Sequence, residues 1–437
     1  AGRPVLYNHR VQLNYKLPFQ YIPYLDFIDV EAGYGFTYNW NARSTVLRNF
    51  VNPDTNQREN LGSIGQNTNV IQVTGTADIP KFFGQFGYFK KMSDKLQKRK
   101  TEMDSLNTAY TQAWEKKRYA YKKYKFKNRL TMMQNVAFLF TSFKQLDVSF
   151  TENSGTVLPG LLSAPNWYGI GQTNGGPTAG FLFGSQADIR RTVLENNWVS
   201  DSEYMIDPYM QMTTRELRAN LQIMPINDFR IDVNVLQNYN RNFTQTGFNY
   251  RDGFGNPNPN FTFATDLITY SNSVILINTA FQDGMAVYAA IRRNAAALSQ
   301  QLGSGYSIAN AYNLIPSFRA AVEGRNPEPL GDPKKAGLPL PNWRITYSGL
   351  RNIPIISGQF TKFDILHSYN ATYTATGIQS SIDYFNARTS GGSLFDLNGD
   401  FINPYTFAQV GYVESFAPLV GIDVTMRNNM QFGLQYN

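Results

Sequence analysis

The stretch Ile28–Trp40, IDVEAGYGFTYNW, alternates between two kinds of side chain over thirteen residues. One set is hydrophobic or aromatic, and the other is acidic, polar or glycine. Successive side chains of a β-strand point to opposite faces, so this period of two predicts a single long strand with different surroundings on its two sides. Strands of soluble proteins usually run about five or six residues. The stretch therefore favours a β-protein whose strands are long enough to cross a membrane.

Shorter or less regular alternation recurs along the chain and predicts about ten antiparallel strands in all. The other nine are Val11–Leu17, Ile71–Ile79, Leu146–Phe150, Leu217–Ile223, Ile231–Val235, Trp343–Gly349, Phe363–Ala375, Thr406–Glu414 and Ile422–Tyr436. Four short connections contain proline, at Pro18 and Pro23, Pro225, Pro354 and Pro418. Proline fixes φ and cannot donate to a ladder, so each of these connections is predicted to be a hairpin turn.

The strand after each proline turn opens with a hydrophobe, an aspartate and a β-branched residue. These aspartates are Asp29, Asp232, Asp364 and Asp423, and a fifth copy, Asp147, follows a basic segment. We interpret them as residues that support strand initiation by accepting hydrogen bonds near the rim. A role as functional charges in an aqueous bore is the alternative.

The direction of successive strands sorts the connections into two sides. The proline turns and the segment 80–143 fall on one side, and the long segments 41–66, 153–212, 241–342 and 378–403 fall on the other. Short turns at one end and long loops at the other are typical of an outer-membrane barrel. The interpretation is an all-β section of a very large transmembrane β-barrel, with 153–212 and 241–342 as extracellular loops.

In such a barrel the two strand faces meet different solvents, hydrocarbon outside and water inside. The predicted lipid-facing residues are Val30, Tyr34, Phe36, Tyr38, Trp40, Ile231, Val233, Met430 and Phe432. The predicted lumen-facing residues are Asp29, Glu31, Arg218, Asp232, Arg344, Asp364 and Arg427. Charged side chains of this second set are best solvated by water, which predicts a wet lumen in place of a packed core.

Composition and motifs argue against an enzyme. The chain has no cysteine, which excludes disulfides and thiol chemistry, and two histidines are too few for a histidine-based metal cluster. His367 is predicted to be a half-buried or interfacial side chain. The motifs at Gly169–Gly176, Arg251–Asn260 and Asp396–Asp400 depart from nucleotide and calcium patterns and are interpreted as loops and turns. We expect no catalytic residue, cofactor or metal.

The net charge of +8 is concentrated in one segment. Lys90–Arg129 holds fourteen Lys or Arg against four acidic residues, a balance of +10 that leaves about −2 for the rest. Hydrophobic residues at helical spacing predict a basic helical insert at 90–129 on the periplasmic side. Its partner-binding candidates are Lys116, Lys117, Arg118, Lys122, Lys123 and Lys125. A solvated helical hairpin, a dock for an acidic partner or anionic lipid, and a single-stranded nucleic-acid surface remain open, although a periplasmic location offers no nucleic acid.

The segment 241–342 is too long for a bare loop and contains helix signals. Met285–Gly303 is rich in alanine and ends on glycine, which predicts a helix with a glycine stop. With the following stretch Ser307–Gly324 it is predicted to form a small helical cap over the pore mouth.

Five stretches, taken together and in order, resemble the SprA/Sov family, the outer-membrane translocon of the Bacteroidetes type 9 secretion system. They are GFTYNWNA at 35–42, LGSIGQNTNVIQVTG at 61–75, LPNWRITYSGL at 340–350, FDILHSYNATYT at 363–374 and FAPLVGIDVTMRNNMQFGLQY at 416–436. Each alone is a barrel-strand pattern of modest specificity, whereas their order is quite specific. The matching stretches are spread over most of the chain.

The resemblance implies that the chain is one section of a single barrel with on the order of three dozen strands. It implies secretion of folded cargo proteins that bear a C-terminal targeting domain. It further implies a PorV-like smaller barrel, a plug protein, and periplasmic and lipoprotein subunits as partners, in contact with outer-membrane lipid. The rival interpretations are a complete porin or outer-membrane protease, a nutrient transporter, and a soluble carbohydrate-binding β-protein.

Overall fold

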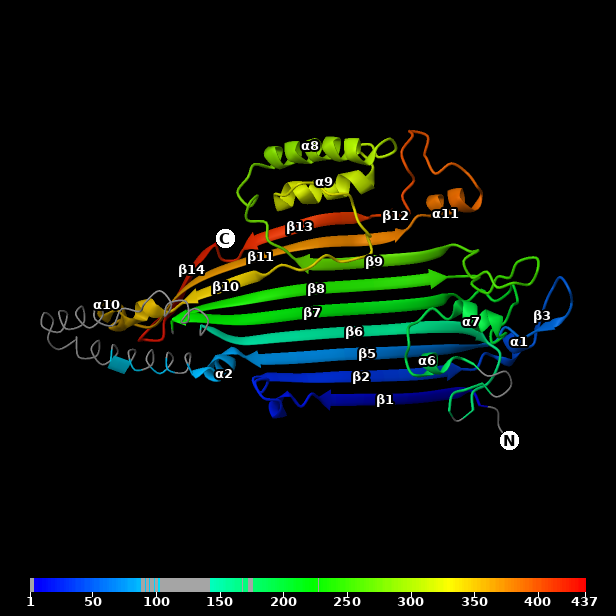
Figure 1. Ribbon diagram of the computed structural model, residues 1–437, viewed down its shortest axis with the longest axis horizontal. Helices are drawn as coiled ribbons and strands as arrows, with labels where there is room; N and C mark the ends of the chain where they lie inside the picture. The colour runs from blue at the N-terminus through cyan, green and yellow to red at the C-terminus, as the bar shows by residue number, and fades with distance from the viewer. Residues whose placement is uncertain are drawn as a thin grey trace, which may run out of the picture.

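The protein is built on one large antiparallel sheet (Figure 1). The computed structural model describes residues 4–87, 142–166, 168–171, 176–226 and 228–437, with the separate positions 91, 94, 98, 101 and 102. Neighbouring strands follow the order β1-β2-β5-β6-β7-β8-β10-β11-β14-β15, with β9 also between β8 and β11, and β12 and β13 beside β11. The predicted all-β, antiparallel class is confirmed.

The strands of the large sheet, called the wall strands below, include several of fourteen residues or more, such as β2 with 14 and β11 with 21. They are β1 (Leu6–Lys16), β2 (Ile28–Asn41), β5 (Ser63–Asp78), β6 (Phe143–Leu161), β7 (Tyr209–Ile226), β8 (Phe229–Gln245), β9 (Ala264–Ser273), β10 (Asn342–Tyr347), β11 (Phe360–Ser380), β12 (Tyr405–Thr406), β13 (Gln409–Phe416), β14 (Val420–Met426) and β15 (Gln431–Tyr436). β3 (Phe50–Val51) and β4 (Arg58–Glu59) form a separate small ribbon. Each of the ten predicted stretches overlaps one or two strands of the large sheet, and β9 is the strand of this sheet that was not predicted.

Short helices occupy the connections, and two longer ones form an insert. They are α1 (Thr45–Arg48), α2 (Ile79–Gly84), α6 (Ala179–Leu182), α7 (Arg190–Glu195), α8 (Gly284–Leu302), α9 (Ala311–Glu323), α10 (Pro354–Ser357) and α11 (Ile382–Thr389), with 3-10 turns at Phe19–Tyr21 and Gly349–Asn352. The predicted glycine stop is confirmed, because α8 ends at Leu302 and Gly303 follows with φ 88°. Among the described residues, no helix combines the length and the hydrophobicity needed to cross a membrane.

The predicted separation of connections between two ends holds. The connections 17–27, 348–359 and 427–430 lie at the turn end, as do the strand ends that 79–142 and 227–228 join, and 42–62, 162–208, 246–263 and 381–408 connect strands at the loop end. In Figure 1 the turn end, with α2 and α10, is on the left, and the loop end, with α6 and α7, is on the right. The predicted loops 153–212 and 241–342 were too wide, because they include parts of β6, β7 and β8 and all of β9.

Pro418 does not form a hairpin turn, which corrects one of the four proline predictions. β13 and β14 are both antiparallel to β11, so they run in the same direction and make one interrupted wall strand. Proline lacks the N–H that the ladder needs, so the strand breaks there. The backbone still bridges the break, because the Ser368 N–H donates to the Pro418 carbonyl at 2.8 Å and the Ala417 N–H donates to the Ser368 carbonyl at 3.1 Å.

The C-terminal stretch Ile422–Tyr436 is a hairpin, although its alternation predicts one strand. β14 and β15 pair with each other, and the chain turns at 427–430, where Asn429 has a positive φ of 65°. Asparagine tolerates this left-handed conformation better than most residues. Because residues directly opposite in a hairpin share a face, Ile422 and Leu434 still lie on the same side. The two strands of the hairpin continue one alternation pattern, so the sequence pattern does not reveal the turn between them.

The helical insert 274–341 leaves the wall between β9 and β10, which together fill one strand position between β8 and β11. Two side chains complete the ladder at this exit. The Asn342 amide accepts the Ala371 N–H at 3.1 Å and donates to the Ala371 carbonyl at 3.2 Å, while the Ser273 hydroxyl accepts the Leu236 N–H at 3.1 Å. Buried backbone groups that would otherwise be unpaired are thereby satisfied.

Candidate functional site

The candidate functional site is the pair of chemically different faces of the sheet. Directly paired residues share a face, so the register connects Asp232 to Arg344 and Asp29 through Thr76 to Asp147. This face, the polar face, carries six of the seven predicted lumen residues: Asp29, Glu31, Arg218, Asp232, Arg344 and Asp364. The opposite face, the aromatic face, carries Val30, Tyr34, Phe36, Tyr38, Trp40, Ile231, Val233 and Phe432.

Two predicted residues do not lie in the wall strands. Arg427 and Met430 belong to the turn 427–430. The Arg427 guanidinium donates to the Ser357 carbonyl, at 2.9 Å from Nη2 and 3.2 Å from Nε, and so connects two turns at the turn end. Arg427 and Met430 were predicted as lumen-facing and lipid-facing residues of one strand. Both predictions are wrong, because these residues lie in the turn between β14 and β15.

The five repeated aspartates all lie on the polar face near the turn end. Three accept from the side chain two residues earlier in the same strand. The Asp147 carboxylate accepts from Gln145 at 2.8 Å, Asp232 accepts from Arg230 at 2.7 Å, and Asp364 forms an ion pair with Lys362 at 3.3 Å. Asp29 instead pairs with Lys16 of the neighbouring strand at 2.5 Å. These partners are side chains on the same face, not the backbone groups of the adjacent turns.

The polar face is hollowed. A depression of about 600 Å³ crosses β6 to β9 and β11. The polar-face residues that line it are Thr151, Asn153, Thr214, Glu216, Asn238, Asn240, Thr269, Ser271, Thr372 and Thr374. A second depression, of about 130 Å³, crosses β1, β2 and β5 around Gly33 and Gly35. Both hydrophobic clusters of the described chain pack against the aromatic face. The polar face therefore offers a concave lining in which short, neutral hydrogen-bonding side chains predominate, with Glu216 and Arg10 as charged members.

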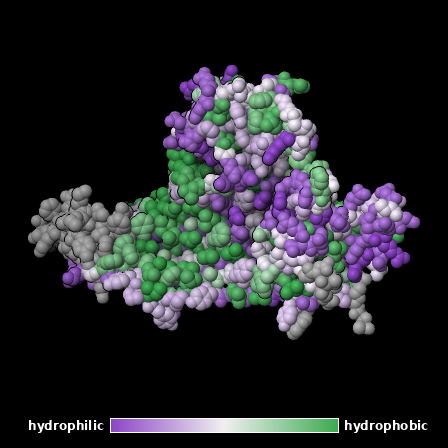
Figure 2. Space-filling view, turned by 45° about the vertical axis from the view of Figure 1, so that its right-hand side comes forward, coloured by the Kyte–Doolittle hydropathy of each residue, from purple (hydrophilic) through white to green (hydrophobic). Residues whose placement is uncertain are grey.

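The half of the aromatic face near the turn end is apolar, and none of the described residues forms a packed cover over it. We call it the apolar band: Leu13, Tyr15, Val30, Ala32, Val73, Leu146, Val148, Leu217, Leu221, Ile231, Val233, Val235, Ile345, Phe363, Ile365, Ile422, Val424, Phe432 and Leu434. Leu13 is 60% exposed and Tyr15 63%. Figure 2 shows a broad hydrophobic patch toward the end of the sheet that carries α10, and mostly hydrophilic side chains at the other end.

The half of the aromatic face near the loop end is covered by protein. The connection 162–208 folds back over it, so Tyr38 and Trp40 are 0% and 1% exposed and Phe36 is also buried. The Phe181 ring meets the Tyr38 ring at 6.0 Å between centroids. These three aromatic residues are therefore buried by protein, which corrects their prediction as lipid-facing residues. Local alternation places a side chain on a face but cannot show that a distant loop covers it.

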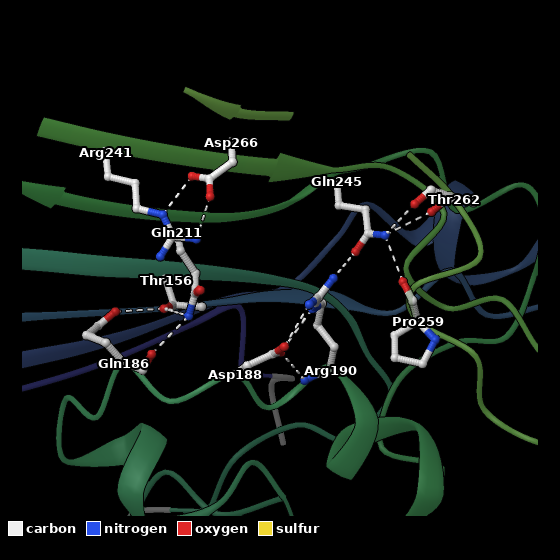
Figure 3. Close-up of polar contacts among 10 residues, drawn as sticks. All are labelled: Thr156, Gln186, Asp188, Arg190, Gln211, Arg241, Gln245, Pro259, Thr262 and Asp266. Atoms are coloured by element: carbon white, nitrogen blue, oxygen red, sulfur yellow. Dashed lines mark hydrogen bonds and ion pairs between the residues drawn. The ribbon is translucent and has the colours of Figure 1, made fainter. Parts of the chain in front are cut away.

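A buried polar network fastens two loop-end connections to the aromatic face (Figure 3). Its centre is Arg190, which donates to the Asp188 carboxylate at 2.9 Å from Nε and 2.7 Å from Nη2. Arg190 also donates from Nη1 to the side-chain oxygen Oε1 of Gln245. The Gln245 amide in turn donates to the carbonyls of Pro259 at 2.7 Å and Thr262 at 3.0 Å. Although burial opposes it, hydrogen bonds from Arg190 hold the pKa of Asp188 below its usual range.

Two charged pairs lie at the edge of the apolar band that is nearer the loop end. Arg215 bonds Glu152 at 2.5 Å, and Arg241 forms a two-pronged contact with Asp266 at 2.6 and 2.9 Å (Figure 3). Sequence reasoning missed these residues and Arg190. A signal was present for the strand residues, because charged side chains occupy positions of β6, β7 and β8 where the period of two predicts hydrophobic ones.

The helical insert also packs on the aromatic face and does not close the mouth of a pore. The Arg319 guanidinium lies 4.7 Å from the centre of the Tyr373 ring, and the Phe318 and Tyr412 rings are 5.5 Å apart. Tyr373 and Tyr412 are paired on β11 and β13 and face the same side. The predicted position of the cap is therefore corrected: apolar and aromatic residues of α9 bury themselves against the wall.

The motif interpretations hold where the structure describes them. The Asp252 carboxylate accepts backbone N–H groups of Phe254 and Asn256 at 2.9 and 2.8 Å, and Asp396 accepts those of Asn398 and Asp400 at 2.8 Å each, as turns require. His367 is half-buried, as predicted, and donates from Nδ1 to the Leu419 carbonyl at 2.8 Å. Among the described residues, no three His, Cys, Asp or Glu side chains gather as a metal site.

The basic insert cannot be placed in this site. Its partner-binding candidates, Lys116 to Lys125, lie outside the described residues.

No protein-family model matches the chain, and no curated protein sequence matches it either.

Proposed function

We propose that this chain forms a section of the wall of a large β-barrel in the bacterial outer membrane, and that the barrel conducts proteins, as the resemblance to the SprA/Sov translocon implies. The observation that carries the proposal is the division of one antiparallel sheet into a concave polar face and an opposite face with an uncovered apolar band. A barrel in lipid needs this division, because its outside contacts hydrocarbon and its inside contacts water.

The edges of the sheet support a section of a larger barrel. The sheet has ten wall positions, and β1 and β15 are its two edge strands. In hydrocarbon an edge strand would leave its backbone donors and acceptors unpaired, so both edges need partner strands. We propose that further strands pair with β1 and β15 to enclose a bore wider than ten strands would give.

The polar face supports a bore filled with water. Side chains fill the interior of a barrel of about eight strands, but the lining here consists mainly of Thr, Ser, Asn and Gly around two depressions. Passage of folded cargo with a C-terminal targeting domain, and association with a PorV-like barrel, a plug protein and accessory subunits, are proposed on the resemblance alone. We propose no enzymatic step and no cofactor.

Single-cysteine labelling tests the two solvents directly, because the chain has no cysteine of its own. Val148 and Ser149 are neighbours in β6 that face opposite sides. In lipid bilayers, a spin label on Val148→Cys should be more accessible to dissolved oxygen, and one on Ser149→Cys to a water-soluble nickel chelate. A label on Tyr38→Cys, beneath the connection 162–208, serves as the shielded control. If the Val148 label is as shielded as the Tyr38 label, the membrane proposal is wrong.

A complete ten-stranded barrel for solutes is the second candidate, and the ten wall positions favour it. It requires β1 to pair with β15. Gln12 and Gln435 lie on the polar face of these two strands, so a short thiol cross-linker should join Gln12→Cys to Gln435→Cys only if the sheet closes on itself. The pair Arg10→Cys and Thr37→Cys, which lies directly across a ladder, is the positive control. We expect the control pair to cross-link and the test pair to remain apart.

A further inference from the structure

A cationic cavity lies on the aromatic face, between the wall and the returning segment of the helical insert. It has a volume of about 390 Å³ and is lined by Arg215, Gln237, Tyr239, Arg241, Lys334, Lys335 and Ala336. Four of these seven residues are cations, contributed by β7, by β8 and by the segment that leads from α9 to β10. The wall and the insert therefore both supply positive charge to one pocket.

The returning segment is held beside the wall by contacts within the protein. The Gly337 carbonyl accepts the Gln237 amide at 2.7 Å and the Asn272 amide at 3.0 Å, which fastens the returning segment to β8 and β9. The Lys334 ammonium lies 5.4 Å from the centre of the Tyr405 ring, a distance at which a cation is attracted to an aromatic face. The segment that carries both lysines is therefore positioned before any ligand binds.

The charges of the cavity do not cancel. Glu152 pairs with Arg215, Asp266 pairs with Arg241, and the Asp332 carboxylate accepts the Lys334 backbone N–H at 3.0 Å. Three carboxylates thus oppose four cations, which leaves a net charge of about +1. Within the described part of the chain neither lysine forms an ion pair with a carboxylate.

The arginines keep donors for a ligand. Among the described residues, the Arg215 guanidinium bonds Glu152 through Nε, and its side chain is 50% exposed. Although burial lowers the pKa of Lys334, the nearby Tyr405 and Asp332 raise it on balance, so its ammonium is charged at neutral pH. The cavity therefore presents ammonium and guanidinium N–H groups, which make strong charge-assisted hydrogen bonds to phosphate oxygens.

Apolar surface begins next to the cavity, on its side nearer the turn end. Leu217 lies two residues from Arg215 on β7, and Val235 lies two residues from Gln237 on β8, on the same face. Both belong to the apolar band. A soluble anion would use only the cations, whereas a molecule with an anionic head and apolar tails matches both surfaces.

We propose that this cavity binds the phosphate headgroup of an anionic membrane lipid, whose acyl chains lie along Leu217 and Val235. The inference rests on the proposed membrane function, because only a membrane presents such a lipid to the apolar band. A bound headgroup would contact Lys334 and Lys335 of the insert and Arg215 of the wall together. Because a ligand stabilises the state that binds it, the lipid would strengthen docking of the insert on the wall.

Native mass spectrometry of the full-length protein in detergent tests the proposal with three probes: dioleoyl phosphatidic acid, dioleoylglycerol and inorganic phosphate. The variant Lys334→Gln/Lys335→Gln should bind phosphatidic acid at least about tenfold more weakly, a loss of about 1.4 kcal/mol, because it removes both ammonium donors of the insert. The control Arg292→Gln/Arg293→Gln removes the same charge from exposed positions of α8 and should bind as the unmodified protein does. Dioleoylglycerol should not bind, and inorganic phosphate should not displace the lipid.

Three results would overturn the proposal. Unchanged phosphatidic acid binding by the lysine variant would remove the cavity from the site, and equal binding of dioleoylglycerol would show that no headgroup is recognised. Displacement by equimolar inorganic phosphate would show a soluble-anion site. The spin label on Val148→Cys distinguishes failure of the headgroup proposal from failure of the membrane proposal. It reports contact with lipid whether or not the cavity binds a headgroup.

Discussion

Along β2, one side of a single strand carries Val30 and Ala32 near the turn end and Tyr38 and Trp40 near the loop end. The first two belong to the uncovered apolar band, and the second two are sealed beneath the connection 162–208. The same face therefore has two surroundings, separated by the charged pairs around Arg215 and Arg241. Alternation therefore assigns a side chain to a face, whereas distant loops that fold back determine which part of that face stays uncovered.

The largest effect is expected from emptying the covered half. Trp40→Ala should destabilise the packing of the connection 162–208 by about 3–5 kcal/mol, because it leaves a cavity under a fully buried ring. Limited proteolysis within 162–208 should become faster. Tyr15→Ala removes an exposed aromatic ring from the same face of β1 and should leave this cleavage rate unchanged. Equal cleavage in the two variants would contradict the division of the face.

The apolar band is tested by a charge. Val233→Arg places a cation inside the band, away from the cationic cavity, and should reduce stability in bilayers by about 2–4 kcal/mol, the cost of arginine near the middle of a membrane. Leu236→Arg on the same strand is the control, because the Leu236 side chain points to the polar face and is 38% exposed. It should cost less than about 1 kcal/mol, since its charge would meet water. Urea unfolding in liposomes measures both, and similar losses would mean that the two faces share one solvent.

The polar network of the covered half should have a smaller effect. Arg190→Met removes the donor that Asp188 and Gln245 share and should reduce the stability of the covered half by about 1.5–3 kcal/mol, as expected for hydrogen bonds to charged groups. Arg191→Met alters the next residue, which is 69% exposed and forms only a long contact with Glu195, and should cost less than about 0.5 kcal/mol. Protection of 162–208 against hydrogen exchange compares the two, and an equally large loss for Arg191→Met would be the contrary result.

The strands could be predicted because their information is local. Thirteen alternating residues of β2 specify a strand and its two faces, and the order of strand directions places the connections at two ends. The turn at 427–430 escaped prediction because a hairpin with paired neighbours continues the alternation through it. Pro418 predicted a turn because its missing N–H interrupts a straight wall strand in the same way that it opens a hairpin.

The covering of the aromatic face could not be predicted, because it depends on contacts between distant segments. His9 on β1 donates from Nε2 to the Leu182 carbonyl at 2.9 Å, across 173 residues of chain. No period in either segment reports that contact. The cationic cavity likewise combines β7 and β8 with Lys334 and Lys335, more than ninety residues later. Charged residues at aromatic-face positions were the one local sign that this face is not apolar along its whole length.

The smallest effect is expected at the helical insert, where a change of pH can be reversed. Burial opposes charge on Glu323 in α9, but hydrogen bonds from Tyr412 and Arg325 lower its pKa below the usual range on balance. A carboxyl with a lowered pKa stabilises the folded state above its unfolded value of about 4.3, and that stabilisation is lost as the pH falls through the folded value. Proteolysis of 274–341 should therefore accelerate below about pH 4.3. Glu323→Gln should raise cleavage at pH 7 and flatten the pH dependence, whereas Glu328→Gln, an exposed position of the same insert, should do neither. A pH profile that Glu323→Gln leaves unchanged would show that this contact does not hold the insert on the wall.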